Sequence, residues 1–100
     1  MTALSFHPEA LLEFEAAAAH YDGEQPGLGH RFIGNVESAL DRICAFPSGS
    51  PELLPGVRRC LVRVFPYAVL YAEHDGGVVV LAIMHCHRRP GYWRHRSSQP

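Results

Sequence analysis

The spacing of apolar residues changes once along this chain, at residues 47–56. Before this segment apolar residues recur at helical spacing, and after it they alternate along shorter stretches. The segment itself, PSGSPELLPG, holds three prolines and two glycines, which is typical of a loop. Helices followed by strands predict an α+β fold, in which the helices cover one face of a mainly antiparallel sheet.

Two amphipathic helices are expected in the first half, after a short strand at residues 3–7. The first helix, residues 8–22, begins at a proline, which suits a first helical turn. The second covers roughly residues 28–46, and the glycine-containing turn pairs between them predict a helical hairpin. The acids of the first helix lie mostly off its apolar face and are interpreted as solvent-exposed: Glu9, Glu13 and Glu15.

Three strands are expected after the loop, at residues 57–65, 67–73 and 78 to about 88. The Asp75-Gly76-Gly77 sequence predicts a tight hairpin between the last two. The last strand is apolar on both faces as far as Met84, which indicates a central strand covered on both sides. The predicted order is β-α-α-β-β-β, with four strands in the sheet.

The length and composition fit one globular domain. One hundred residues, 47% of them hydrophobic, supply a single core, so we expect one domain over residues 1–100 with a flexible tail at 94–100. No apolar run approaches the length of a membrane span, and the N-terminus lacks the basic start of a signal peptide. The three cysteines lack CxxC spacing and fit a reducing compartment.

Positive charge gathers in the second half. Seven of the nine basic residues, all arginines, follow residue 50, together with three acids. Arg59 and Arg63 share one face of their strand, and Arg88 and Arg89 lie just before an aromatic pair. Guanidinium groups beside aromatic rings favour contact with an anionic partner. Two interpretations stay open, because these arginines could instead pair with the acids of the helices.

The histidines near the end of the last strand are candidates for chemistry. His85 and His87 face the same way on a strand, which would supply two ligands of a metal site. No third ligand has suggestive spacing, so we expect no metal and no cofactor. A histidine that titrates near neutral pH could serve as an acid or base in phosphodiester chemistry if RNA is bound.

Short motifs follow the helical hairpin in a fixed order: G-V-R-R at residues 56–59, F-P-Y at 65–67, VLY ending at Tyr71 and R-R-P-x-Y-W at 88–93. In order and spacing, over nearly the whole chain, this pattern resembles the RelE/ParE superfamily of small bacterial toxins from type II toxin–antitoxin modules. The resemblance implies a cytoplasmic toxin with a RelE/ParE-like fold and a cognate antitoxin that neutralises it. It also implies contact with operator DNA only through the antitoxin, and no membrane.

The superfamily divides by target. ParE-like members inhibit DNA gyrase, and RelE-like members cut messenger RNA on the ribosome. The F-P-Y motif and the arginine-rich ending favour the ParE-like branch, whose members act without catalysis. If the chain is instead a RelE-like endoribonuclease, the resemblance implies these catalytic candidates: Arg59, His85, Arg88 and Tyr92. A third alternative is a non-toxic co-repressor or partner-binding module. The residues expected to contact a partner are Leu61, Arg63, Phe65, Arg89 and Trp93.

Overall fold

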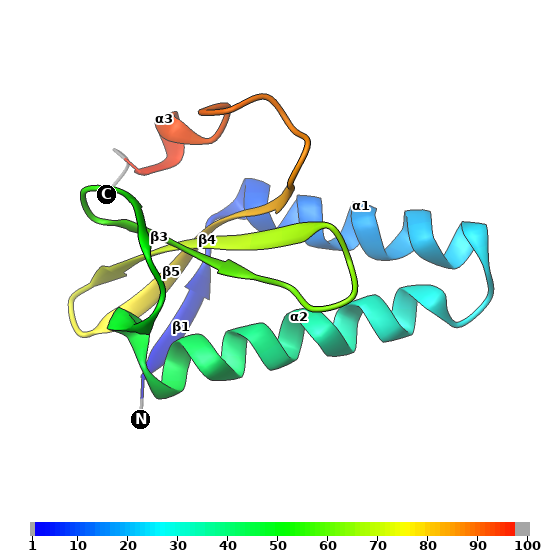
Figure 1. Ribbon diagram of the computed structural model, residues 1–100, viewed down its shortest axis with the longest axis horizontal. Coiled ribbons are helices and arrows are strands. Elements are labelled where there is room, and N and C mark those ends of the chain that lie inside the picture. Colours follow the sequence, from blue (N-terminus) through cyan, green and yellow to red (C-terminus); the bar gives the residue numbers. More distant parts are fainter. Residues whose placement is uncertain (1, 98–100) are drawn as a thin grey trace.

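Two helices and a five-stranded sheet form packed layers in the computed structural model, which describes residues 2–97 (Figure 1). The helical elements are α1 (Pro8–Glu24), α2 (Leu28–Ala45), the short 3₁₀ helix η1 (Pro47–Gly49) and α3 (Arg94–Ser97). The strands are β1 (Ala3–Phe6), β2 (Glu52–Leu54), β3 (Val57–Leu61), β4 (Tyr67–His74) and β5 (Gly77–His85). The predicted α+β class and the helical hairpin are confirmed.

The strands lie in the order β1-β5-β4-β3-β2. β1 runs parallel to β5, with Ala3 opposite Gly77, and the other neighbours are antiparallel. Asp75 and Gly76 connect β4 to β5 with φ angles of 51° and 77°, which aspartate and glycine tolerate. The predicted mainly antiparallel sheet and its tight hairpin are therefore confirmed.

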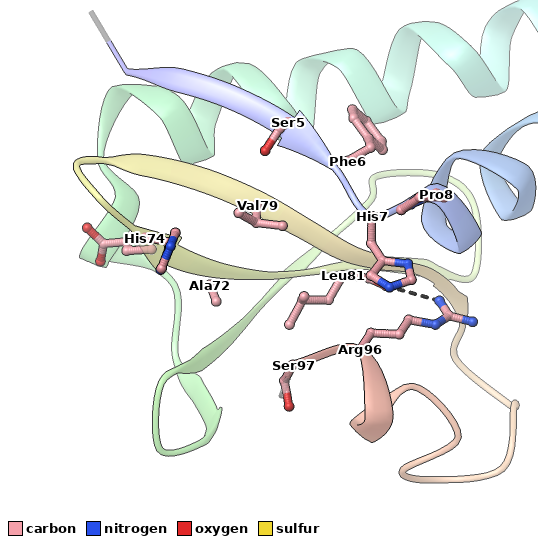
Figure 2. Close-up of a pocket in the computed structure, with 11 residues that line it drawn as sticks. Ser5, Phe6, His7, Pro8, Ala72, His74, Val79, Leu81, Arg96 and Ser97 are labelled. Atoms are coloured by element: carbon pink, nitrogen blue, oxygen red, sulfur yellow. Dashed lines mark hydrogen bonds between the residues drawn. The ribbon is translucent and has the colours of Figure 1, made fainter. Parts of the chain in front are cut away.

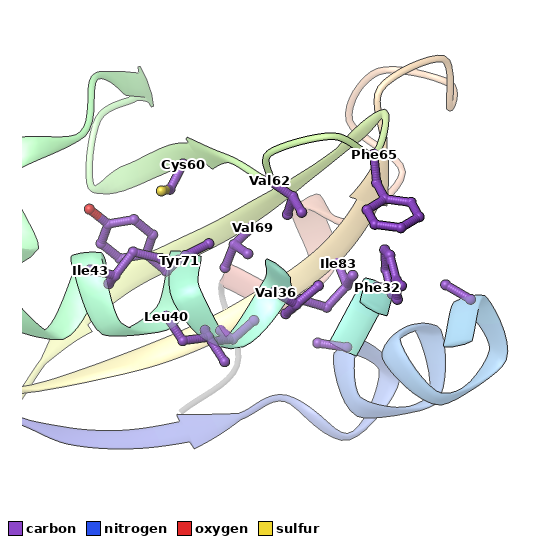
Figure 3. Packing of buried hydrophobic residues seen from close by; sticks show 14 of the residues in the cluster. Phe32, Val36, Leu40, Ile43, Cys60, Val62, Phe65, Val69, Tyr71 and Ile83 are labelled. Carbon is purple, nitrogen blue, oxygen red and sulfur yellow. The ribbon is translucent and has the colours of Figure 1, made fainter. Parts of the chain in front are cut away.

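The main core lies between the helices and the sheet. Figure 3 shows side chains of α2 pointing toward β4 and β5, with Tyr71 and Val69 facing the helix. The largest fully buried residues of this layer are Phe32, Val36, Ile43, Val69, Tyr71, Val78, Val80 and Ile83. The Tyr71 hydroxyl donates a 2.6 Å hydrogen bond to the carbonyl oxygen of Pro47, which ties η1 to the core.

α1 and α2 approach each other closely at Gly29. A Cβ atom at this position would lie 2.3 Å from the carbonyl oxygen of Ala18, so the contact requires glycine. The Asp22 carboxylate accepts hydrogen bonds from the N–H groups of Gly27 (3.0 Å) and Gly29 (3.3 Å). These two bonds satisfy donors at the start of α2 and fix the hairpin.

β5 contains one extra residue, Leu81, relative to β4. Tyr71 pairs with Val80, whereas the preceding Leu70 pairs with Ala82. Such a bulge shifts the alternation of side chains, and Val80 and Ile83 both join the core beneath the helices. Leu81 and Ala82 are buried on the opposite face, so the prediction of a strand covered on both sides is confirmed.

The expected strand at residues 57–65 ends early, at Leu61. Val64 has a φ of 75°, which interrupts the extended backbone. In a continuous strand Phe65 would share a face with Leu61, but the interruption turns its ring toward Phe32 (Figure 3). The last strand also ends early, because the chain turns after His85 and the Arg88 N–H donates to the His85 carbonyl oxygen. β2 was not expected, and it adds a fifth strand.

Candidate functional site

The C-terminal segment, residues 86–97, crosses the face of the sheet that the helices leave open (Figure 1). Trp93 is 2% exposed and packs in a second cluster with small and aliphatic side chains of the sheet. The members of that cluster are Val57, Ala68, Leu70, Leu81, Ala82 and Trp93. A flexible tail was expected at residues 94–100. Residues 94–97 form α3 and place Arg96 in a buried position, and residues 98–100 lie outside the described residues.

Arg96 holds this segment to the first helix. Its Nε donates to Glu9 Oε2 at 2.9 Å, and its Nη1 donates to Glu13 Oε1 at 2.9 Å. A second Arg96 nitrogen, Nη2, donates to Glu13 Oε2 at 3.1 Å, so the contact with Glu13 is bidentate. The Arg96 side chain is 6% exposed, that of Glu13 17% and that of Glu9 47%. The Glu13 pair is therefore the more buried part of this ion cluster.

Glu13 and Arg96 also complete the edge of β5 where β1 ends. The His7 N–H makes the last main-chain bond of this edge, to the Val80 carbonyl oxygen. Beyond it, Arg96 Nη1 donates to the Leu81 carbonyl oxygen (3.0 Å) and Glu13 Oε1 accepts from the Ile83 N–H (3.0 Å). The two side chains thus provide partners that a longer β1 would otherwise provide.

The cluster fixes the charge states of its members. Burial raises the pKa of Tyr92, and a hydrogen bond with Glu13 raises it further. Burial alone would lower the pKa of Arg96, but Glu13 and Glu9 outweigh it and the net pKa is raised. Desolvation raises the pKa of Glu9, whereas His95 and Arg96 lower it, and the lowering prevails. Near neutral pH, Arg96 and Glu9 are charged and Tyr92 is neutral.

The hollow drawn in Figure 2, about 410 Å³, lies beside this cluster over β1, β4 and β5. The arginine that lines this hollow is Arg96, whose side chain extends from α3 toward His7 and Leu81. Because Arg96 already donates to Glu9, Glu13 and a carbonyl oxygen, little of its charge is left for a ligand. This hollow is therefore a weak candidate for an anion.

A second hollow, about 340 Å³, lies on the other side of the C-terminal segment, and we call it the arginine groove. Its cationic residues are Arg59, Arg88 and Arg94. Its apolar lining includes Leu53, Leu54, Met84 and Trp93. Among the described residues that line it there is no aspartate or glutamate. The arginine groove therefore combines positive charge with an apolar floor.

The arginines of the groove have no ionic partners within residues 2–97. Among the arginines of this part of the chain, Arg96 alone has a carboxylate within 4.0 Å. Arg42 and Arg58 donate to backbone carbonyl oxygens instead. The alternative interpretation, in which Arg59 and Arg63 form ion pairs with the acids of the helices, is therefore not observed among the described residues. Their charge is available to a partner.

The candidate catalytic residues do not gather in one hollow. Arg59 lines the arginine groove, whereas His85 lines a separate hollow of about 230 Å³ with Tyr67, His20 and Glu13. Arg88 lines both, and its guanidinium carbon lies 4.2 Å from the centre of the Tyr92 ring. The His87 N–H donates to His85 Nδ1 (3.1 Å), which leaves the proton of a neutral His85 on Nε2.

Two of the residues predicted to contact a partner are buried. Phe65 is 8% exposed and packs edge-on against Tyr21 and Phe32, at ring-centroid distances of 4.9 and 5.2 Å. Trp93 is 2% exposed and also lines the arginine groove, so its contact with a partner remains a prediction. Leu61, Arg63 and Arg89 are exposed, and their role remains a prediction.

Sequence reasoning missed Glu9, Glu13, Arg94 and Arg96. The two glutamates were interpreted as a solvated face, but they hold Arg96. Their spacing of four residues places them on one side of a helix, together with the buried Ala10 and Ala17. That spacing was a usable signal, although nothing in the sequence indicates that their partner lies 83 and 87 residues away.

Two further observations concern the described residues. Within residues 2–97 no group of three or more histidine, cysteine, aspartate or glutamate side chains is placed to hold a metal ion. Over the same residues, every helix is too short or too polar to cross a bilayer. His85 and His87 lie with ring centroids 5.4 Å apart but without a third ligand among these residues.

The fold and the groove define a small α+β protein with a cationic, apolar-floored surface suited to an anionic partner. Residues 4–90 match a family model described as "ParE toxin of type II toxin-antitoxin system, parDE". The chain belongs to this family of ParE toxins, within the RelE/ParE superfamily that the motifs predicted.

Two known proteins illustrate the relationship. One is "Putative toxin Y4kP" of Sinorhizobium fredii (strain NBRC 101917 / NGR234), which is 25% identical over 81 residues, 80% of this chain and 83% of that protein. The other is a solved structure entitled "Chromosomal ParDE TA system from P. aeruginosa", with a TM-score of 0.74 and 18% identity over 85% of this chain and 96% of that one. At that identity the second comparison supports the fold.

Proposed function

We propose that this ParE-like toxin inhibits DNA gyrase in the cytoplasm and that a cognate antitoxin neutralises it. The observation that carries the proposal is the match of residues 4–90 to the ParE toxin model. The separation of Arg59 from His85 also supports it, because a gyrase inhibitor needs no catalytic constellation. The target is then a protein, and inhibition is a binding event.

The purified chain is expected to block supercoiling by purified gyrase, because the proposed inhibition is direct. Its expression without an antitoxin should arrest growth, lengthen the cells and induce the DNA damage response before translation falls. The measurement is a plasmid supercoiling assay with increasing toxin, together with separate labelling of DNA and protein synthesis in cells. Normal supercoiling at a large molar excess of toxin would contradict the proposal.

A ribonuclease is the second candidate, and the hollow at His85 favours it. His85 lies with its ring 5.1 Å from that of Tyr67, and Arg88 lines the same hollow, so an acid–base group, a phenol and a cation share one space. In that case translation would stop first, and messenger RNA would be cut in the ribosomal A site. Loss of cutting in His85→Ala, with the fold retained, would identify this function. Harmless expression would instead indicate the co-repressor alternative.

The arginine groove is the proposed binding site of the antitoxin. An apolar floor favours a protein segment over a bare polyanion, and three guanidinium groups without a carboxylate partner favour acidic side chains on that segment. The solved structure entitled a ParDE TA system supports an antitoxin as the partner. The groove therefore fits a segment that alternates acidic and apolar residues.

The double variant Arg59→Glu/Arg94→Glu is expected to bind the antitoxin about 10- to 100-fold more weakly, because it places two negative charges where the partner's carboxylates lie. The deficit should shrink as salt is raised. The measurement is calorimetric titration with the product of the adjacent reading frame at low and high salt. Arg31→Glu, an exposed change on α2, is the matched control and should bind like the wild type. Equal affinities for both variants would contradict this location.

A further inference from the structure

The loop between β3 and β4, residues 62–66, holds a residue that is both strained and exposed. Val64 is 79% exposed and has a φ of 75°. Positive φ is unfavourable for a β-branched side chain, and glycine or asparagine would adopt it more readily. An exposed valine in this conformation gains no burial in return. Strain of this kind is commonly found where a segment makes a functional contact.

The loop is anchored firmly on both sides of Val64. The ring of Phe65 packs between Tyr21 and Phe32, as Figure 3 shows for Phe32. The Val62 N–H donates to the Tyr67 carbonyl oxygen (2.9 Å), and the Cys86 N–H donates to the Pro66 carbonyl oxygen (2.8 Å). The neighbours of Val64 are thus fixed, and its side chain is presented to solvent on a rigid support.

The chemistry around Val64 is that of a protein contact. Arg63, next to it, is exposed and has no carboxylate partner within residues 2–97. Arg42, Arg59 and Arg63 line a hollow of about 520 Å³ beside β3, and no acid among the described residues lines it. An apolar tip beside cations fits an apolar pocket with carboxylates at its rim. None of residues 62–66 lines the arginine groove, although Arg59 lines both that groove and the hollow beside β3.

We propose that Arg63 and Val64 are the residues by which this toxin engages its target, a folded protein with an apolar pocket and an acidic rim. The inference rests on the proposed function, because it names the toxin surface used for inhibition. The antitoxin, in contrast, occupies the arginine groove. The strain at Val64 is then kept because a valine side chain, and not the asparagine or glycine that the backbone favours, fills the pocket of the target.

The test is Val64→Asn, which suits the backbone and removes the apolar tip. Its melting temperature should rise by roughly 4–8 °C as strain is relieved. Growth arrest should be lost, and the concentration needed for half-inhibition of the target should rise roughly 10- to 30-fold, as for a contact hot spot. Affinity for the antitoxin should be unchanged. Leu12→Gln is the control, since Leu12 is 64% exposed on α1 and outside both surfaces.

Undiminished growth arrest by Val64→Asn would overturn the inference, because the tip would then be dispensable. Loss of antitoxin binding in this variant would overturn it as well, since the loop would belong to the antitoxin surface. If the wild type arrests growth but leaves gyrase active, gyrase is contradicted as the target, while the comparison of growth arrest still decides the role of the loop. A wild-type chain without effect on growth would overturn both proposals.

Discussion

Replacing Arg96 with methionine is expected to lower the free energy of unfolding by about 3–5 kcal/mol, because removal of one member of a buried ion pair leaves the other uncompensated. The carboxylate left behind is that of Glu13, which is 17% exposed and also accepts the Ile83 N–H. Glu9, at 47% exposure, is solvated enough to contribute little to the loss. The measurement is urea unfolding followed by circular dichroism.

A double-mutant cycle separates the ion pair from the packing of the Arg96 stem. In Arg96→Met/Glu13→Gln the buried charge is gone and an amide oxygen can still accept the Ile83 N–H, so most of the lost stability should return. Arg89→Met, an exposed change in the same segment, should alter stability by less than about 0.5 kcal/mol. A loss of stability below about 1 kcal/mol for Arg96→Met would mean that Arg96 does not form its ion pairs with Glu9 and Glu13 in solution.

Replacing Trp93 with alanine should destabilise the protein by about 3–5 kcal/mol, since it empties the space beneath the C-terminal segment. Domains of this size are stable by about 5–15 kcal/mol, so a large part of the total would be lost. The residues around Trp93 are largely alanine, valine and leucine on a rigid sheet, which cannot collapse into the gap. Denaturant unfolding measures the effect, and Trp93→Phe should show a smaller loss.

The burial of Trp93 can also be tested by fluorescence. Trp93 is the single tryptophan of the chain, so intrinsic fluorescence reports on it alone. A buried indole should be protected from acrylamide quenching in the free protein. Ready quenching of the native protein, or a Trp93→Ala variant of wild-type stability, would show that the segment does not cover the sheet.

Periodicity predicted most of the fold because the elements it describes are stabilised along one face. The apolar face of α2 had to pack against a sheet, and the apolar run of β5 had to be covered on both faces. The failures occurred where single backbone angles or distant contacts decide. The positive φ of Val64 ended β3 and reversed Phe65, and β2 is only three residues long. Neither feature leaves a periodic trace in the sequence.

The site was predictable in its charge and less so in its geometry. The excess of arginine after residue 50 correctly indicated a cationic surface, and the motifs indicated the family. Which arginine is buried did not follow, because Arg96 looks like part of a polar tail in the sequence. Its burial depends on Glu9 and Glu13, at the other end of the chain. Such pairings over long sequence separations are visible in a structure alone.

The ion pairs of Arg96 with Glu9 and Glu13 also affect the order in which this fold can form during synthesis. The ribosome adds Arg96 87 residues after its partner, Glu9. Until then the C-terminal segment cannot dock, and Arg88, Arg94 and Trp93 cannot form their side of the arginine groove. A nascent chain therefore lacks the proposed antitoxin surface until Arg96 has been added.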